Sequence, residues 1–254
     1  MPTKCDAARE LGMVRPTLSS FMKSIYPTVS CLCLSLCIAS GCMSVDAQTP
    51  TVNLQFVSFP KAANPEPVEL LIGEGKTIDV EIPTNSISKT YKVPAISTWA
   101  LGKSAFDEEG KFTFQVYGKT QARGTHDQLI LVVRKGRNDG DGLELIPLKN
   151  NDQGFGGGKY FLLNASSVDI AGTIGTGKFS LKPKKYDLIA PKPTKTKGDR
   201  KYCFAQFYFR TKEEIQPFFS STWRFNKKAR SMVFFYHDPN TKRLRIHTIR
   251  SFAF

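Results

Sequence analysis

Alternation of apolar and polar residues constrains this chain more than any other feature. Val52, Leu54 and Phe56 alternate with polar neighbours, as in a half-buried strand, and the segment 78–82 repeats the pattern. The continuous apolar run 129–133 is typical of a central strand that is buried on both faces. No stretch after residue 50 shows a convincing helical period. The pattern therefore predicts an all-β fold.

The chain also repeats itself. Three elements recur in the same order at offsets of 101 to 103 residues, and the first is a motif, Ile-Gly-x-Gly-Lys, whose copies agree at four of five positions. The paired segments are 72–76 with 174–178, 129–133 with 232–236, and 143–146 with 244–247. A fixed order at a nearly constant offset predicts a duplicated β-domain. The alternative is that any β-rich chain offers apolar runs that align.

A glycine-rich segment, 150–158, separates the two copies and has the composition of a linker. Each copy has about the size of an immunoglobulin-like sandwich of roughly seven strands. We therefore predict two tandem antiparallel β-sandwich domains behind an N-terminal signal segment. The expected boundaries are 1–47 for the signal segment, 48–149 for the first sandwich, 150–158 for the linker and 159–254 for the second, basic sandwich.

The N-terminal region is similar to an export signal. An apolar stretch, 30–39, follows Lys23; it is too short for a membrane span of about 20 residues but has the length of a signal-peptide core. Because Met22 and Lys23 give the short basic start of such a signal, we predict that translation begins at Met22.

Two processing routes fit this signal. Residues 39–42, Ala-Ser-Gly-Cys, resemble a bacterial lipobox, which would place a lipid on Cys42. Val45, Asp46 and Ala47 satisfy the small-residue rule of ordinary signal peptidase, which would release a chain that begins at Gln48. Both routes predict an exported protein that is periplasmic, anchored to the outer membrane or secreted. The lipobox favours a bacterial source.

The net charge of +14 is concentrated in the last third of the chain. Residues 48–177 contain 13 basic and 14 acidic side chains, whereas residues 178–254 contain 19 basic and five acidic ones. A strongly basic domain favours anionic partners. Because export argues against nucleic acid, the expected partner is an acidic envelope polysaccharide or lipid headgroups, and the alternative is another envelope protein.

Basic clusters with interleaved aromatic residues are the strongest functional lead. They lie in a Pro/Lys loop, at residues 227–230, and on the C-terminal strand, where Arg245 and Ile246 should face opposite ways. The predicted anion-binding residues are Lys192, Lys195, Lys197, Lys227, Lys228, Arg230, Arg243 and Arg245. The alternative interpretation needs no ligand, since lysine and arginine along an edge strand also prevent edge-to-edge aggregation.

Two loop motifs resemble ligand sites but are better explained as turns. Residues 172–178 match the first positions of a phosphate-binding loop, yet Phe179 replaces the required hydroxyl residue and a strand pattern follows. A glycine hairpin is the preferred interpretation. Residues 138–142 are rich in Asp and Gly but lack the ligand spacing of an EF-hand calcium loop, so a hairpin loop is the preferred interpretation and a weak, exposed calcium site is the alternative.

No catalytic or cofactor motif is recognisable. The histidines, His126, His237 and His247, lack metal-ligand spacing, and Cys203 is the one cysteine after Cys42. Cys203 lies among aromatic residues, which predicts a packed rather than a reactive thiol. The sequence thus predicts a non-enzymatic binding module without a cofactor. The alternatives are a structural subunit of a larger envelope assembly and a hydrolase that uses His126 or His237.

Overall fold

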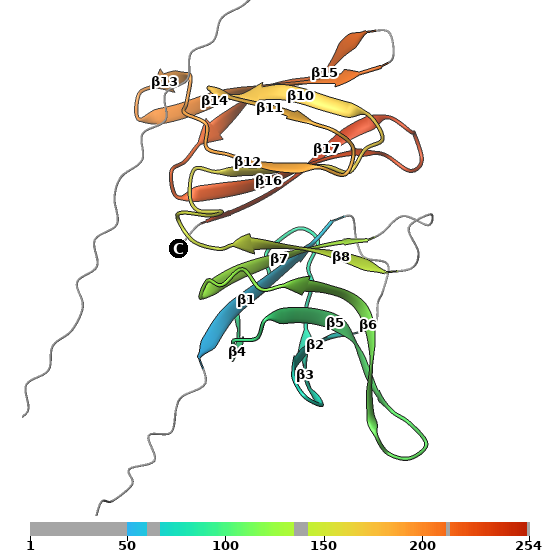
Figure 1. The fold of residues 1–254 in the computed structure, drawn as a ribbon. Helices are drawn as coiled ribbons and strands as arrows, with labels where there is room; N and C mark the ends of the chain where they lie inside the picture. Colours follow the sequence, from blue (N-terminus) through green and yellow to red (C-terminus); the bar gives the residue numbers. More distant parts are fainter. Residues whose placement is uncertain (1–49, 60–66, 135–141, 212–213, 253–254) are drawn as a thin grey trace, which may run out of the picture. The chain divides into compact units, whose positions relative to one another are not determined.

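The computed structural model describes residues 50–59, 67–134, 142–211 and 214–252. These ranges form seventeen β-strands and no helix, which confirms the all-β prediction (Figure 1). Residues 47–254 make one compact unit. Several predictions fall outside the described residues: the signal core, the start at Met22, the processing sites at Cys42 and Ala47, and most of the loop 138–142. In the described ranges no helix is long and apolar enough to cross a membrane.

The first half builds two four-stranded sheets. Its strands are β1 (Thr51–Ser58), β2 (Val68–Gly73), β3 (Lys76–Val80), β4 (Tyr91–Pro94), β5 (Thr98–Phe106), β6 (Phe112–Gln121), β7 (Asp127–Arg134) and β8 (Leu143–Lys149). Sheet A has the order β4-β1-β7-β8, and sheet B has the order β3-β2-β5-β6.

The second half builds two further sheets. Its strands are β9 (Tyr160–Asn164), β10 (Asp169–Ile174), β11 (Gly177–Leu181), β12 (Tyr186–Ile189), β13 (Lys195–Lys197), β14 (Arg200–Arg210), β15 (Ile215–Phe225), β16 (Ala229–His237) and β17 (Leu244–Phe252). Sheet C has the order β12-β9-β16-β17. Sheet D contains β11-β10-β14, and both β13 and β15 pair with β14.

Sheets A and C are mixed rather than purely antiparallel, which corrects the sequence-based expectation. β1 pairs with β7 in parallel, from Asn53 opposite Asp127 to Ser58 opposite Val132, and β9 pairs with β16 in the same sense. An alternating pattern shows which face of a strand is buried but not the direction of the strand. A parallel pair needs a long crossover connection, and the strands of sheet B supply it between β1 and β7.

The two halves have the same strand order and the same strand directions. β1 to β8 correspond in order to β9, β10, β11, β12, β14, β15, β16 and β17, so β13 is the one described strand of the second half without a counterpart. The correspondence extends to loop hydrogen bonds. The amide of Ser58 donates to the carbonyl of Pro83 at 2.8 Å, and the amide of Asn164 donates to that of Lys185 at 2.9 Å.

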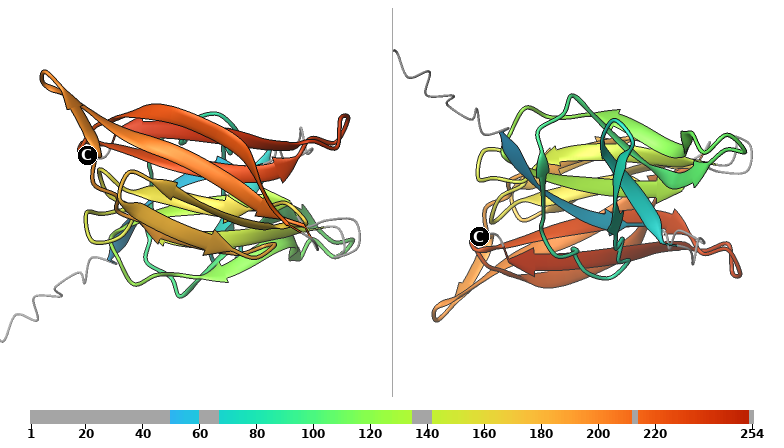
Figure 2. Two further views of the ribbon diagram at one scale, coloured as in Figure 1. Left: turned by 90° about the horizontal axis from the view of Figure 1, so that it is seen from above. Right: turned by 90° about the horizontal axis from the view of Figure 1, so that it is seen from below.

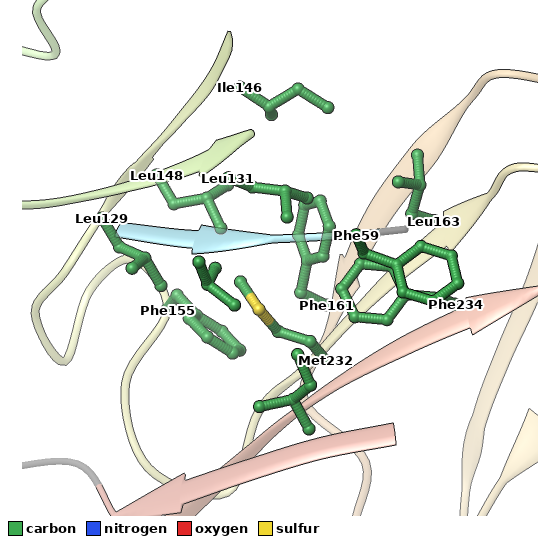
Figure 3. Close-up of a cluster of buried hydrophobic side chains, with 12 residues drawn as sticks. Phe59, Leu129, Leu131, Ile146, Leu148, Phe155, Phe161, Leu163, Met232 and Phe234 are labelled. Carbon is green, nitrogen blue, oxygen red and sulfur yellow. The ribbon is translucent and has the colours of Figure 1, made fainter. Parts of the chain in front are cut away.

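Three clusters of buried side chains hold the sheets together. One lies between sheets A and B around Trp99, and another lies between sheets C and D around Phe207. The third joins sheets A and C, and in it Phe59 stacks on Phe234 with ring centroids 4.3 Å apart (Figure 3). Sheets A and C are therefore buried on both faces, as predicted for the run 129–133. The outer faces of sheets B and D remain accessible; Figure 2 shows the molecule from these two sides.

The glycine-rich segment between the halves is packed against them. Phe155 is 1% exposed and belongs to the cluster between sheets A and C. The ammonium group of Lys159 donates to the three consecutive carbonyls of residues 152–154 at distances of 2.6 to 2.9 Å. The Asn150 side chain donates to the Gln55 side chain of β1 at 2.8 Å. These contacts attach the segment to the core.

Candidate anion-binding face

Three of the predicted basic contacts lie on a part of sheet D that has no equivalent in the first half. β4 and β5 are joined by three residues, 95–97, whereas the corresponding strands β12 and β14 are joined by ten, 190–199. The longer connection contains β13, which pairs with the first residues of β14. β13 occupies an edge that β10 leaves free, because β10 pairs with β14 only from Ala205 to Arg210. Lys192, Lys195 and Lys197 all lie in this insertion.

The insertion is held on the glycine turn between β10 and β11. The Thr176 amide donates to the carbonyl of Lys192 at 3.1 Å, and the Lys192 amide donates to the Thr176 hydroxyl at 3.0 Å. Gly175 has a φ of 57°, and a Cβ there would lie 2.2 Å from the Lys192 carbonyl oxygen. Glycine is required by both the backbone conformation and the close approach. The predicted glycine hairpin is thus confirmed, and Phe179 points into the core with 7% exposure.

Paired residues on the outer side of sheet D form a basic and aromatic surface. Lys195 of β13 lies opposite Tyr202 of β14, which lies opposite Arg224 of β15. Directly paired residues share one face and neighbouring strands lie about 4.8 Å apart, so these three side chains form a row. Lys197 and Arg200 form the next row. We define the basic face as Lys195, Lys197, Arg200, Tyr202, Phe204 and Arg224.

An open pocket of about 270 Å³ lies at the edge of the basic face, where β14 begins and β15 ends. It is lined by Asp199, Arg200, Lys201, Arg224, Phe225, Asn226 and Lys227. Within the described ranges, none of its four cations forms an ion pair with Asp199, the one acidic residue of the lining. Cations that are not compensated by acids attract anions into a concave site. The pocket therefore suits a carboxylate, sulfate or phosphate group.

One predicted contact, Lys227, lines this pocket, and four others lie on the two stretches of chain that border it, residues 190–199 and 226–228. Lys192, Lys195 and Lys197 are exposed on the insertion, and Lys227 and Lys228 are exposed in the turn between β15 and β16. The two stretches meet because the start of β14 pairs with the end of β15, Lys201 opposite Phe225. The structure thus unites two clusters that are separate in the sequence.

The third predicted cluster lies elsewhere. Arg243 and Arg245 are exposed at the turn between β16 and β17, whereas Lys227 and Lys228 precede β16. β16 runs for nine residues, Ala229–His237. This length separates the ends of the strand by about 26 Å at roughly 3.3 Å per residue. A single small anion cannot contact both ends, although an extended polymer can.

Arg230 is not available to a ligand, which corrects its prediction as an anion contact. It is 2% exposed, and its Nη1 donates to the Asn150 side chain and to the carbonyl of Phe155, the latter at 2.9 Å. Its Nε donates to the Ser251 hydroxyl at 3.0 Å. Burial lowers the pKa of Arg230 to about 10, so the group stays charged at neutral pH. Arg230 instead fixes the segment between the halves.

Three pocket residues, Arg200, Lys201 and Arg224, were not among the predicted contacts. Arg224 stands between Trp223 and Phe225, which both pack against the core between sheets C and D. Strand alternation alone therefore places Arg224 on the outer face. The pairing of the start of β14 with the end of β15 brings Arg200 and Lys201 to the pocket. No comparable local pattern in the sequence indicates this pairing, because it depends on the register of the hairpin.

The histidines that a hydrolase would use lie in different halves. His126 Nδ1 is 3.4 Å from Asp127 Oδ1 and 3.3 Å from the amide nitrogen of the Asn53 side chain. His237 Nδ1 is 3.1 Å from the carbonyl oxygen of Lys242. In the part of the chain that the structure describes, neither ring contacts a serine, threonine or cysteine side chain by a hydrogen bond. The same residues contain no group of three or more His, Cys, Asp or Glu side chains that could hold a metal ion.

Cys203 is packed, as predicted. Its side chain is fully buried in the core between sheets C and D, with Sγ 3.8 Å from the carbonyl oxygen of Lys192. Burial raises the pKa of the Cys203 thiol, which disfavours the reactive thiolate. The residue thus supports the base of the insertion.

No protein-family model and no curated protein matches the sequence. The fold therefore defines the class: an all-β protein with four sheets in two pairs and one basic outer face.

Proposed function

We propose that this chain is an exported, non-enzymatic binding module of the bacterial cell envelope or the secreted fraction, and that its basic face binds an anionic envelope component. One observation carries the proposal: four cations surround an open pocket that contains a single acidic residue. The pocket lies beside the β13 insertion, which contributes Asp199 to it, and β13 is the one described strand of the second half without a counterpart in the first.

The arrangement favours a repeating anionic ligand. The pocket accepts one acidic group, and Tyr202 and Phe204 offer aromatic surface beside it, with Phe204 44% exposed. Aromatic faces pack on sugar rings and on the membrane interface. Acidic polysaccharide and lipid headgroups share this chemistry, in which anions recur at short intervals. The more distant Arg243 and Arg245 would reinforce binding of a long polymer only.

We also propose that the two halves arose by duplication and that residues 1–47 direct export. The shared strand order, the repeated glycine motif and the matching loop hydrogen bonds support the duplication. The apolar stretch after Lys23 supports the export signal. Intact-mass measurement after fractionation of the host tests the second part. A lipid on Cys42 would identify a membrane-tethered protein, an N-terminus at Gln48 a released one, and an uncleaved chain in the cytoplasm would refute export.

Binding is tested with two probes, a labelled polyuronate and vesicles that contain phosphatidylglycerol, each with a neutral counterpart: dextran and phosphatidylcholine vesicles. The site variant carries Lys195→Gln, Lys197→Gln, Arg200→Gln and Arg224→Gln. The control variant carries Lys92→Gln, Lys111→Gln, Lys119→Gln and Lys182→Gln, four exposed lysines outside the pocket and the predicted contacts, and removes the same charge.

The site variant should lose affinity roughly tenfold or more, because each exposed charge contributes up to about 1 kcal/mol. The control should lose little affinity for either probe. Binding should also weaken with salt, and the salt dependence should be shallower in the site variant. The preferred probe identifies the ligand class. Equal losses in the two variants would show that net charge, not the basic face, is responsible, and absence of binding to both probes would refute the proposal.

A further inference from the structure

Sheet B forms the other accessible outer face, and its charge is opposite to that of sheet D. The segments that build sheet B, 68–81 and 98–121, contain seven acidic and four basic residues. The segments that build sheet D, 169–181, 195–210 and 215–225, contain two acidic and seven basic residues. Corresponding sheets of the two halves therefore carry complementary charge.

Sheet B also exposes a row of apolar side chains. Phe106 lies opposite Phe112 in the β5–β6 hairpin, with ring centroids 6.1 Å apart, and Phe112 stacks on Phe114 at 6.5 Å. Val116 continues the row on the same face, two residues after Phe114. Phe106 is 72% exposed and Val116 is 50% exposed. We define these four residues as the aromatic stripe. A row of apolar side chains left in water marks a contact surface.

Acidic groups border the aromatic stripe in fixed positions. Glu69 lies on the same outer face, opposite Gly102, and its carboxylate accepts a hydrogen bond from the amide of Ser104 at 3.2 Å. Hydrogen bonding to Ser104 lowers the pKa of Glu69, so the group is ionised at neutral pH. At the hairpin tip, the Asp107 carboxylate accepts bonds from the amides of Glu109 and Lys111 at 3.1 and 2.8 Å. These bonds order the acidic tip.

We propose that the outer face of sheet B docks on the basic face of a second copy of this chain. The stripe would meet Tyr202 and Phe204, and the acidic border would meet Lys195, Lys197 and Arg224. Face-to-face packing of sheets already occurs within the chain, where sheets A and C meet through buried apolar side chains. Because the two docking faces differ, the contact is heterologous and generates open chains or closed rings. The partner face is the one that the proposed function uses, so polyanion and self-association should compete.

The test compares single-face variants of residues 47–254, the complete compact unit. The B-face variant carries Phe106→Ser, Val116→Thr and Glu108→Lys, and the D-face variant carries Phe204→Ser and Arg224→Glu. Phe252→Ser is the control, because Phe252 is 71% exposed but lies on sheet C. Circular dichroism verifies folding. Sedimentation velocity follows the mass up to about 1 mM protein. Salt is varied from about 0.1 M to about 1 M NaCl, over which the Debye length falls from roughly 10 Å to 3 Å.

The native unit and Phe252→Ser should gain mass with concentration and lose it with salt, and each single-face variant should remain monomeric under the same conditions. An equimolar mixture of the two variants should form a one-to-one complex and nothing larger, because it contains one intact pair of faces. The inference is overturned if the native unit stays monomeric throughout, if the D-face variant still self-associates, or if the mixture forms no complex.

The outcome separates this inference from the proposed function. The B-face variant should bind polyuronate as the native unit does, because its basic face is intact. Retained polyanion binding by a strictly monomeric native protein would refute self-association alone. Assembly without any polyanion binding would refute the proposed function alone.

Discussion

The two halves of this protein differ less in architecture than in what is attached to it. Both have the same strand order, and both pair their first and seventh corresponding strands in parallel. They differ in the connection between the fourth and fifth corresponding strands, which has three residues in one half and ten in the other. The longer connection contains Lys192, Lys195 and Lys197. Among the described residues, the second half therefore differs from the first by an added basic strand at a sheet edge.

This difference shows why the insertion is tolerated. It pairs with backbone that β10 leaves free and rests on the turn that contains Gly175. The corresponding turn in the first half contains Gly75, whose Cβ position is met only by the ring of Phe112, at 3.8 Å. A repeated glycine turn thus supports an added strand in one half and the aromatic stripe in the other.

The largest expected effect on stability tests whether the two halves unfold independently of each other. Phe234→Ala, in the cluster shared by sheets A and C, should cost about 3–5 kcal/mol, as for other buried Phe truncations. The two tryptophans report on one half each, since Trp99 lies in sheet B and Trp223 in sheet D. In a Trp223→Phe background, the Trp99 fluorescence transition should shift with Phe234→Ala even though the substitution is in the other half.

The physical reason is that Phe234 packs on Phe59 of the first half. An unchanged Trp99 midpoint would mean that the halves unfold independently, and the comparison would then concern two domains rather than one cooperative unit. The Trp223→Phe protein without the core substitution is the matched reference.

The next prediction compares the stability costs of truncating two corresponding residues, Arg230 in the second half and Asp127 in the first. Arg230→Ala should cost roughly 2–3 kcal/mol, because it leaves the Asn150 side chain and the Phe155 carbonyl without their buried donor. At the repeat offset of 103 residues, the corresponding residue of β7 is Asp127. Its side chain is 39% exposed and accepts one bond from Asn53 at 2.9 Å. Asp127→Ala should therefore cost about 1 kcal/mol or less.

Urea denaturation of both variants measures the contrast. Arg230→Met serves as a control that keeps much of the side-chain volume but removes the donors. Equal costs for the two alanine variants would show that burial has not made position 230 more important than position 127.

The sequence predicted those features that local alternation determines. Leu244 and Ile246 pack against the core between sheets C and D, while His247 stacks on Phe59 at 5.3 Å on the opposite side, as the pattern of this strand requires. The run 129–133 was likewise interpreted correctly, since Leu129 and Ile130 are fully buried in clusters on opposite faces of sheet A.

Features that depend on register and on distant partners were not predictable in this way. Arg230 follows two exposed lysines in the sequence, so it was grouped with them, but β16 starts at Ala229 and carries Arg230 into the interior. The pocket could not be predicted either, because it requires Arg200 and Arg224 to meet across a hairpin. Strand direction leaves no mark on an alternating pattern, so the parallel pairs were missed.

A smaller effect concerns the insertion itself. Gly198, in the β13–β14 turn, has a φ of 57° and no atom within 4 Å of a Cβ position, so Gly198→Ala tests backbone strain alone. The expected cost is about 1–2 kcal/mol. Affinity for polyuronate should fall about twofold, because part of the hairpin population loses its pairing with β14.

The first half provides the control for this substitution. Gly73 also has no atom within 4 Å of a Cβ position but lacks the positive φ. Gly73→Ala should leave stability unchanged or slightly higher, because it restricts the unfolded chain. A similar loss for both variants, measured by thermal unfolding, would remove the argument that the insertion depends on its own turn.

The smallest effect distinguishes the cores by their response to pH. Tyr160 of β9 is buried against the core between sheets C and D, and burial raises its pKa from 10.0 to about 12, with the nearby Cys203 adding to the shift and Arg250 opposing it. The folded state therefore keeps a proton that the unfolded chain releases. The stabilisation is complete below pH 10 and is lost as the pH rises through 12. At the corresponding position the first half has Leu54, which does not titrate.

The difference in unfolding free energy between the native protein and Tyr160→Phe, measured by urea denaturation, should be constant up to pH 10 and should then shift against the native protein. A difference that stays constant to pH 12 would show that the tyrosine ionises as easily in the folded protein as in the unfolded chain, and that the two cores respond alike.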